Sequence, residues 1–171
     1  MSVIDKDEII KLVLDSAQNY ADENSTCAKV KVGSIIIPEV VEDDKPFELF
    51  GYMVRGCNHG VHNCKENGCR RIQLYGNASK EHRLPSDCDA LHSEIDAISR
   101  AAKSGRQTRG ATIFVTRYPC EACARAIIAA GIKKVYYGRK ESISDYTAKI
   151  LAAGDVKVIK VDTWEREDNN E

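Results

Sequence analysis

The sequence predicts a three-layer α/β/α fold with a central mixed five-stranded sheet. Five short apolar runs, rich in β-branched residues, alternate with segments of helical periodicity in the order α-β-β-α-β-α-β-α-β. The first two strands adjoin through a short turn, which favours an antiparallel hairpin. Each later strand is separated from the next by a helix, and such units pair their strands in parallel and place helices on both faces of the sheet.

The first half of the chain begins with a helix and a hairpin. Residues 5–22 repeat apolar side chains at helical spacing, and Asp5 can cap this helix. Residues 30–37 are apolar and β-branched, and Pro38 ends the strand they predict. A second strand is expected over residues 47–54, where it would pair with the first.

The second half alternates helices and strands. A helix is expected at residues 91–103 and a strand at 111–116. That strand leads into a helix at 120–130, which Pro119 opens and Gly131 closes. The remaining elements are a strand at 133–137, a helix at 143–153 and a strand at 156–161.

One long segment has no sustained period. Residues 56–90 are rich in Gly, Asn, Cys and His, and a loop of this length in a compact domain is usually functional or internally tethered. We expect one domain over residues 1–171, in which residues 56–90 form a Cys-rich insertion loop. The acidic tail, residues 165–171, is expected to be frayed.

The composition excludes several classes of protein. The chain is 43% hydrophobic with a formal net charge of -1, and it has no basic stripe, so a nucleic-acid partner is not expected. It has no apolar run of bilayer length and no secretory signal pattern, so we expect no membrane partner and a cytoplasmic location. Seven cysteines in a reducing compartment indicate metal ligation rather than disulfides.

Two short motifs predict a metal centre. His92-Ser93-Glu94 opens one predicted helix, and Pro119-Cys120-Glu121-Ala122-Cys123 opens the next, with 27 residues between His92 and Cys120. The pattern His-x-Glu followed by Pro-Cys-x-x-Cys is the known signature of zinc deaminases. A lone His-x-Glu is usually a surface helix, and a lone Cys-x-x-Cys can be redox-active or half of a structural site. Their combination favours a catalytic zinc.

The spacing suits that chemistry. Cys120 and Cys123 lie three residues apart at the start of a helix, where the helix dipole favours thiolates. With His92 they supply three ligands, which leaves the fourth tetrahedral position open for water, as in catalytic zinc sites. Glu94 carries neither a thiol nor an imidazole, and we expect it to move protons as the general acid and base. A thioredoxin-like redox role would leave His92 and Glu94 unexplained.

Around these motifs the chain resembles the cytidine and deoxycytidylate deaminase superfamily, and specifically the deoxycytidylate (dCMP) deaminases. The resemblance runs from about Ser25 to about Val161. It is carried by Ser25-Thr26-Cys27, Lys31-Val32-Gly33, Gly56-Cys57-Asn58, Cys64-x4-Cys69 with Cys88, and Gly131-Ile132-Lys133-Lys134-Val135. The chain departs from the family where Gly-Tyr-Asn-Gly-x-Pro is replaced by Gly56-Cys57-Asn58-His59-Gly60-Val61, and where Ser93 replaces an alanine.

The resemblance implies a cytidine deaminase-like fold and the reaction dCMP + water → dUMP + ammonia, which feeds thymidylate synthesis. It implies a homo-oligomer, often a hexamer, and regulation by dCTP and dTTP. By position, Asn58 would contact the substrate, Tyr118 would pack near the base, and Ser93 would preserve a backbone contact. The choice among dCMP, dCTP and a modified cytosine nucleotide stays open.

A second group of thiols predicts a structural zinc. Cys27, Cys64, Cys69 and Cys88 form a four-sulfur set that would tether the segment 56–90, and similar family members carry such a site. His62 and His82 are rival ligands, and some of these cysteines could instead be free thiols. Cys57 is assigned to packing.

Two rival functions remain. One is another deaminase of the superfamily, acting on cytosine, cytidine, guanine or a tRNA adenosine. The other is a zinc-binding regulatory protein without turnover. Glu94 discriminates between catalysis and regulation, because a purely structural site has no use for a carboxylate beside an open zinc position.

Overall fold

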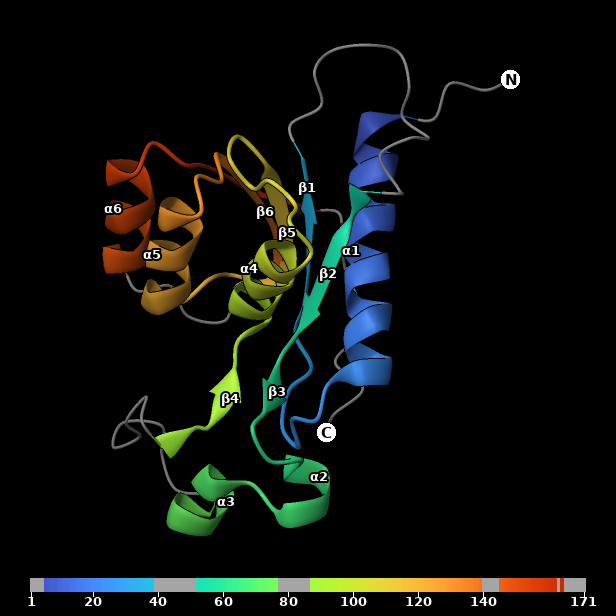
Figure 1. Ribbon diagram of the computed structural model, residues 1–171, viewed down its shortest axis with the longest axis vertical. Helices are drawn as coiled ribbons and strands as arrows, with labels where there is room; N and C mark the ends of the chain where they lie inside the picture. The colour runs from blue at the N-terminus through green and yellow to red at the C-terminus, as the bar shows by residue number, and fades with distance from the viewer. Residues whose placement is uncertain (1–4, 39–51, 77–86, 140–144, 163, 165–171) are drawn as a thin grey trace.

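Residues 5–38, 52–76, 87–139, 145–162 and 164 are described by the structure, a computed structural model (Figure 1). A five-stranded sheet of order β2-β1-β5-β6-β7 lies at its centre. The strands are β1 (Gly33–Ile37), β2 (Val54–Cys57), β5 (Thr112–Arg117), β6 (Lys134–Arg139) and β7 (Lys157–Lys160). β1 is antiparallel to β2 and β5, whereas β5, β6 and β7 are parallel. The predicted mixed five-stranded sheet is confirmed.

Helices cover both faces of this sheet, which confirms the three-layer α/β/α fold. The helix α1 (Lys6–Asn24) packs on one face, and α4 (Ser93–Lys103), α5 (Glu121–Ala129) and α6 (Asp145–Ala153) lie on the other (Figure 1). Side chains alternate along the strands, so that Ile35 and Ile37 face α1 while Ile36 faces α4. Each fully buried aliphatic side chain of these two clusters contributes about 1.5–3 kcal/mol by leaving water.

The hairpin is present, but the expected second strand is misplaced. β2 begins at Val54 and ends at Cys57, where the sequence predicted residues 47–54, and residues 39–51 lie outside the described residues. A Gly-containing Val-Arg-Gly-Cys segment has weak strand propensity. Gly56 is nevertheless required, because a Cβ there would lie 2.5 Å from the Ala97 backbone nitrogen of α4.

The segment expected as a loop contains short elements. They are β3 (His59–Gly60), α2 (Cys64–Asn67), α3 (Arg70–Tyr75) and β4 (Ala90–Leu91). β3 and β4 pair antiparallel as a second, two-stranded sheet. We call residues 59–76 and 87–91 the cysteine lobe; it extends beyond the end of the main sheet (Figure 1).

The remaining helices and strands differ from expectation only at their ends. Residues 77–86 of the predicted loop, the start of the predicted helix at 143 and the tail 165–171 lie outside the described residues. Within the described part of the chain, no helix combines the length and the apolar character needed to cross a bilayer.

Candidate active site

Three metal-ligand side chains meet where two helices begin. His92 is the N-cap residue of α4, Cys120 is the N-cap residue of α5, and Cys123 lies in the first turn of α5. The His92 Nδ1 atom is 3.4 Å from the sulfur of Cys120 and 3.4 Å from the sulfur of Cys123. The ligand atoms of all three lie within 4.8 Å of one another. Cys120 therefore precedes the helix that was expected to include it.

The strand β5 explains why these helix starts coincide. β5 runs directly into the Tyr118–Pro119–Cys120 turn, and the Tyr118 N–H donates to the Arg139 carbonyl at the end of β6. The site therefore lies outside the carboxyl ends of parallel strands, where α/β sheets usually bind ligands. Helix N-termini at this edge also favour negatively charged groups such as thiolates.

The thiols of Cys120 and Cys123 share one hydrogen bond, which shifts their pKa values in opposite directions. The hydrogen bond from Cys123 is the main cause that lowers the pKa of Cys120 to about 3. The same interaction, together with burial, raises the pKa of the Cys123 thiol. The hydrogen bond to Cys120 also raises the pKa of His92, against the effect of burial. The hydrogen bond from Cys123 thus favours the thiolate form of Cys120, the form that binds a metal.

This donor set suits zinc. Two sulfurs and one imidazole nitrogen are ligands that Zn²⁺ prefers, and three protein ligands are typical of catalytic rather than structural sites. Among the described residues, no further His, Cys, Asp or Glu brings a ligand atom into this 4.8 Å group. The residues present therefore fit a zinc ion with an open coordination position.

Glu94 lies next to the three ligands and is buried. Its side chain is 4% exposed, and the Ser93 hydroxyl donates to Oε2 at 3.2 Å. Burial is the largest cause that raises the pKa of Glu94, and the hydrogen bond from its own backbone N–H and the charge of nearby His92 oppose this effect. A carboxyl group with a raised pKa can both hold and release a proton near neutral pH.

Asn58 is buried between β2 and β3, and its side chain makes three hydrogen bonds within the protein. Its Oδ1 accepts from the Val32 N–H at 2.8 Å and from the Ser25 hydroxyl at 2.8 Å. Its Nδ2 donates to the Val30 carbonyl at 2.7 Å. An amide has two acceptor lone pairs and two donor hydrogens, and these bonds use both lone pairs and one of the hydrogens.

Ser93 and Tyr118 are close to the ligands in the chain: Ser93 follows His92, and Tyr118 precedes Cys120 by two residues. Ser93 is fully buried and its hydroxyl is turned to Glu94. Tyr118 is partly buried, packs edge-on against Tyr137 with ring centroids 4.8 Å apart, and its pKa is raised chiefly by burial. The structure thus places both beside the metal-ligand group.

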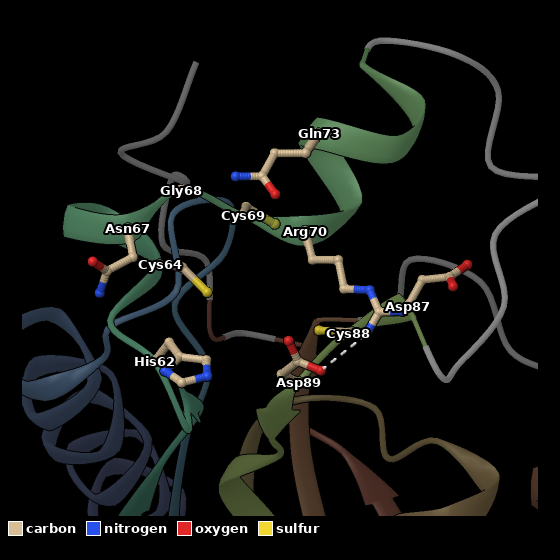
Figure 2. A pocket seen from close by; sticks show the side chains of 10 residues that line it. All are labelled: His62, Cys64, Asn67, Gly68, Cys69, Arg70, Gln73, Asp87, Cys88 and Asp89. Carbon is tan, nitrogen blue, oxygen red and sulfur yellow. Dashed lines mark ion pairs between the residues drawn. The ribbon is translucent and has the colours of Figure 1, made fainter.

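The cysteines of the second predicted site gather without forming a closed cluster. Figure 2 shows Cys64, Cys69, Cys88 and His62 around one pocket of about 220 Å³. Burial first, and then the nearby Cys69, Cys27 and Cys88, raise the pKa of Cys64. Of the described residues, only the His92 group brings its ligand atoms within 4.8 Å of one another. His82 lies outside the described residues.

The sequence reasoning missed Asp96. This carboxylate of α4 is 5% exposed and accepts the Cys57 N–H at 3.1 Å. It also lies 3.3 Å from His59 Nε2 and accepts from Arg100 Nε at 2.9 Å. The Asp96 and Arg100 spacing of four on one helix was a visible signal. The contacts of Asp96 with β2 and β3 join distant parts of the chain and left no signal in the sequence.

The comparisons with known proteins agree that the chain is similar to deaminases. The MafB19-like deaminase model matches residues 68–170, which contain His92, Glu94, Cys120 and Cys123. ComE operon protein 2 of Bacillus subtilis is 33% identical over 138 residues, or 81% of this chain and 64% of that protein. Deoxycytidylate deaminase of Mycobacterium phage D29 is 29% identical over 70% of this chain and 87% of that protein.

A solved structure is similar over nearly all of both chains. The dCMP deaminase of cyanophage S-TIM5, in complex with dCMP and dUMP, has a TM-score of 0.62 and 27% identity over 91% of this chain and 98% of that one. The chain spans less than two thirds of the length of ComE operon protein 2.

Proposed function

The chain belongs to the MafB19-like deaminase family, within the cytidine deaminase superfamily, and from that premise we propose that it is a zinc-dependent hydrolase of a deoxycytidine nucleotide. The proposed reaction is dCMP + water → dUMP + ammonia. The observation that carries this proposal is the convergence of His92, Cys120 and Cys123 beside the buried carboxyl of Glu94. The likeness to a structure that holds dCMP and dUMP supports the choice of substrate.

His92, Cys120 and Cys123 would hold the zinc ion. When bound, zinc acts as a Lewis acid that makes water a better nucleophile near neutral pH. The hydrogen bond from Cys123 assists metal binding, because it lowers the pKa of Cys120 and so favours the thiolate that zinc binds.

Glu94 would move the protons. Its carboxylate takes a proton from the attacking water and delivers it to N3 of the cytosine ring as the oxygen adds to C4. It then carries a second proton to the exocyclic amine, which leaves as ammonia. Burial suits both steps, because it raises the pKa of Glu94 toward the working pH. The Ser93 hydroxyl would orient the carboxyl through its hydrogen bond to Oε2.

Asn58 and Tyr118 would contact the substrate. The remaining Nδ2 hydrogen of Asn58 would donate to an oxygen of the base or sugar, while the other three hydrogen bonds fix its direction. The ring of Tyr118 would pack near the base, held by its contact with Tyr137.

A second, structural zinc would be held by Cys27, Cys64, Cys69 and Cys88. The proposal is supported by the way Cys64, Cys69 and Cys88 gather around one pocket of the cysteine lobe (Figure 2) and by the effect of Cys27 on the pKa of Cys64. Metal binding would have to draw the sulfurs closer together and would stabilise the lobe against α1.

The remaining proposals follow from the family. We expect one deaminase domain over the whole chain, a cytoplasmic homo-oligomer, often hexameric in similar proteins, and a role in supplying thymidylate. Regulation by dCTP and dTTP belongs to the same proposal.

An ammonia-release screen tests the function. Zinc-loaded protein is offered cytosine, cytidine, deoxycytidine, dCMP and dCTP, together with guanine and adenosine, and release from dCMP should be fastest. Preference for guanine or adenosine would favour another deaminase of the superfamily, and no release from any of these compounds would favour a regulatory protein.

Variants test the role of Glu94. Glu94→Gln should keep its zinc and lose turnover by a factor of about 10² to 10⁴. Glu121→Gln is the matched control, because Glu121 is a 41% exposed carboxylate next to Cys120 that pairs with Arg125. Full turnover in Glu94→Gln would contradict the mechanism.

A further inference from the structure

The buried carboxylate of Asp96 joins two parts of the proposed active site. Its backbone N–H donates to the carbonyl of His92, the proposed zinc ligand, at 2.9 Å. Its side chain contacts the residues on both sides of Asn58: Oδ2 accepts the Cys57 N–H at 3.1 Å, and Oδ1 lies 3.3 Å from His59 Nε2. One residue therefore contacts both the start of α4 and the turn between β2 and β3 (Figure 1).

The place of β2 at the edge of the described sheet explains this arrangement. On the inner side of β2, the Asn58 N–H donates to the Val32 carbonyl at 3.0 Å, and the Asn58 side chain bonds to Val30 and Val32. Successive N–H groups of an extended strand point to opposite sides, and an edge strand has no neighbour on its outer side. The Cys57 N–H is thus directed outward, where Asp96 accepts it. The turn is held from both sides.

His59 adds a second connection between this turn and the start of α4. Its backbone pairs with Leu91 across β3 and β4, and Leu91 directly precedes His92. Its side chain faces Asp96, which lies one helical turn after His92. A movement of the turn between β2 and β3 relative to His92 would therefore disturb both contacts of His59.

Packing alone does not account for a carboxylate at this position. Asp96 is 5% exposed, and an unpaired carboxylate is strongly unfavourable when it is buried. The next residue, Ala97, shows that α4 meets β2 closely here through a small side chain. Charge-assisted hydrogen bonds from Arg100 Nε, at 2.9 Å, and from the Cys57 N–H compensate the burial. An apolar side chain could fill the space, but only an acceptor can hold the Cys57 N–H.

We propose that Asp96 is a positioning residue, which holds Asn58 at a fixed place relative to His92 and Glu94, and that His59 shares this task. The effect on substrate affinity rests on the proposed function, because it requires that Asn58 contact the substrate. The positioning itself is independent of turnover. A substitution of the Asp96 side chain leaves its N–H bonded to His92, so that substrate affinity should fall more than the rate of the chemical step.

Hydrogen exchange tests the positioning without any activity. The informative amide is that of Val32, which donates to Asn58 Oδ1 and reports whether Asn58 has moved. Its exchange should accelerate at least about tenfold in Asp96→Ala, and more than the exchange of the fully buried Val115 in β5, which reports global opening. Unchanged exchange at Val32, or equal acceleration at Val32 and Val115, would overturn the proposal.

Two milder variants keep this measurement decisive if Asp96→Ala does not fold. Asp96→Asn keeps an oxygen that can accept the Cys57 N–H and should accelerate the exchange of Val32 less than Asp96→Ala does. His59→Ala truncates a side chain that is 34% exposed, and it should also accelerate the exchange of Val32 relative to Val115. Wild-type exchange in both variants would refute the positioning role.

Kinetics test the consequence for the substrate. Asp96→Ala should keep its zinc, raise the KM for dCMP about five- to tenfold and change kcat by less than about twofold. Asp96→Asn should recover part of the lost affinity. Its matched control is Glu121→Gln, which removes a carboxylate that pairs with Arg125 at the same spacing of four, at 3.6 Å, and should leave the KM unchanged. A fall in kcat without a rise in KM would contradict the proposal.

A double-mutant cycle shows whether Asp96 acts through Asn58. Asp96→Ala should raise the KM in the wild-type background and have little further effect in Asn58→Ala. His59→Ala takes the place of Asp96→Ala in the cycle if the double variant does not fold. Additive effects of the two substitutions on the KM would mean that Asp96 acts on the substrate by another route.

The failure of this inference can be distinguished from the failure of the proposed function. If the zinc-loaded wild type releases no ammonia from dCMP, the proposed function fails, and the exchange of the Val32 amide still decides whether Asp96 positions Asn58. If the wild type is active but the KM for dCMP does not respond to Asp96→Ala or to His59→Ala, the function stands and the positioning role is refuted.

Discussion

The side-chain oxygen of Asn58 accepts the backbone N–H of Val32 at 2.8 Å. The same side chain donates to the Val30 carbonyl at 2.7 Å, and Ser25 donates to it from the end of α1. Asn58 thereby joins the segment that enters β1 to the turn that leaves β2. A residue expected to contact substrate is also the main polar link between these two segments.

Replacing Asn58 with Ala should lower the free energy of unfolding by about 1–3 kcal/mol, because the partly buried Val30 carbonyl and Val32 amide would lose their partner. Urea denaturation measures the change. Asn24→Ala is the control, since Asn24 makes one exposed hydrogen bond to the Tyr20 carbonyl, and it should cost less than about 1 kcal/mol. Equal costs for the two variants would contradict a structural role of Asn58.

The pH dependence of stability should report the burial of Glu94. Burial raises its pKa above the ordinary value of 4.5, so the folded metal-free protein holds this proton more tightly than the unfolded chain does. As pH rises above 4.5, the unfolded state loses its proton first, and stability falls until the folded pKa is passed. Gln cannot ionise and avoids this loss.

Metal-free Glu94→Gln should therefore equal the wild type in stability below pH 4.5 and exceed it increasingly as the pH rises toward neutrality. Urea denaturation of both proteins across this pH range measures the difference. A stability difference that shrinks with rising pH would show that the carboxylate form is favoured in the folded state.

The sequence predicted the layers, the sheet and the metal-ligand trio because each depends on local signals. Helical periodicity and β-branched runs mark the long elements, and short spacings bring Cys120 and Cys123 to the same helix start. β2 was misplaced because its strand pairing depends on Gly56, whose lack of a side chain matters only against α4. The helices α2 and α3 are too short for a period to be detected.

The roles of Asn58 and Asp96 could not be read from the sequence. Asn58 bonds to backbone atoms 26 and 28 positions earlier in the chain, and backbone groups carry no sequence signal. Asp96 reaches the Cys57 amide 39 positions away. Such contacts depend on the packing of β2 between α1 and α4, which only the structure gives.

Metal content should separate the two proposed zinc sites. Elemental analysis of the wild type should give two zinc ions per chain, with one lost in Cys120→Ser and the other lost in Cys69→Ser. Only the second variant should keep deaminase turnover if it folds. Cys57→Ser is the control and should keep both ions, because buried Cys57 is assigned to packing. One ion per wild-type chain would remove the second site.

Gly56→Ala should damage the site through the backbone rather than through a ligand. The added Cβ would lie 2.5 Å from the Ala97 nitrogen and still closer to the Ser93 carbonyl, so the start of α4 has to move. His92 and Glu94 lie on that start. We expect a loss of about 1–3 kcal/mol in stability and, from misplaced catalytic groups, about a hundredfold loss in kcat.

Gly76→Ala separates the two effects of that substitution. Gly76 has a positive φ of 52°, and among the described residues no atom lies within 4 Å of an added Cβ, so Ala there is expected to cost mainly backbone strain. It should lower stability by about 1 kcal/mol and leave kcat unchanged, because the added Cβ does not press on the start of α4 as the one at Gly56 does. If Gly56→Ala lost stability but kept kcat, the fit of β2 against α4 would matter for folding alone, and the placement of His92 and Glu94 would not depend on it.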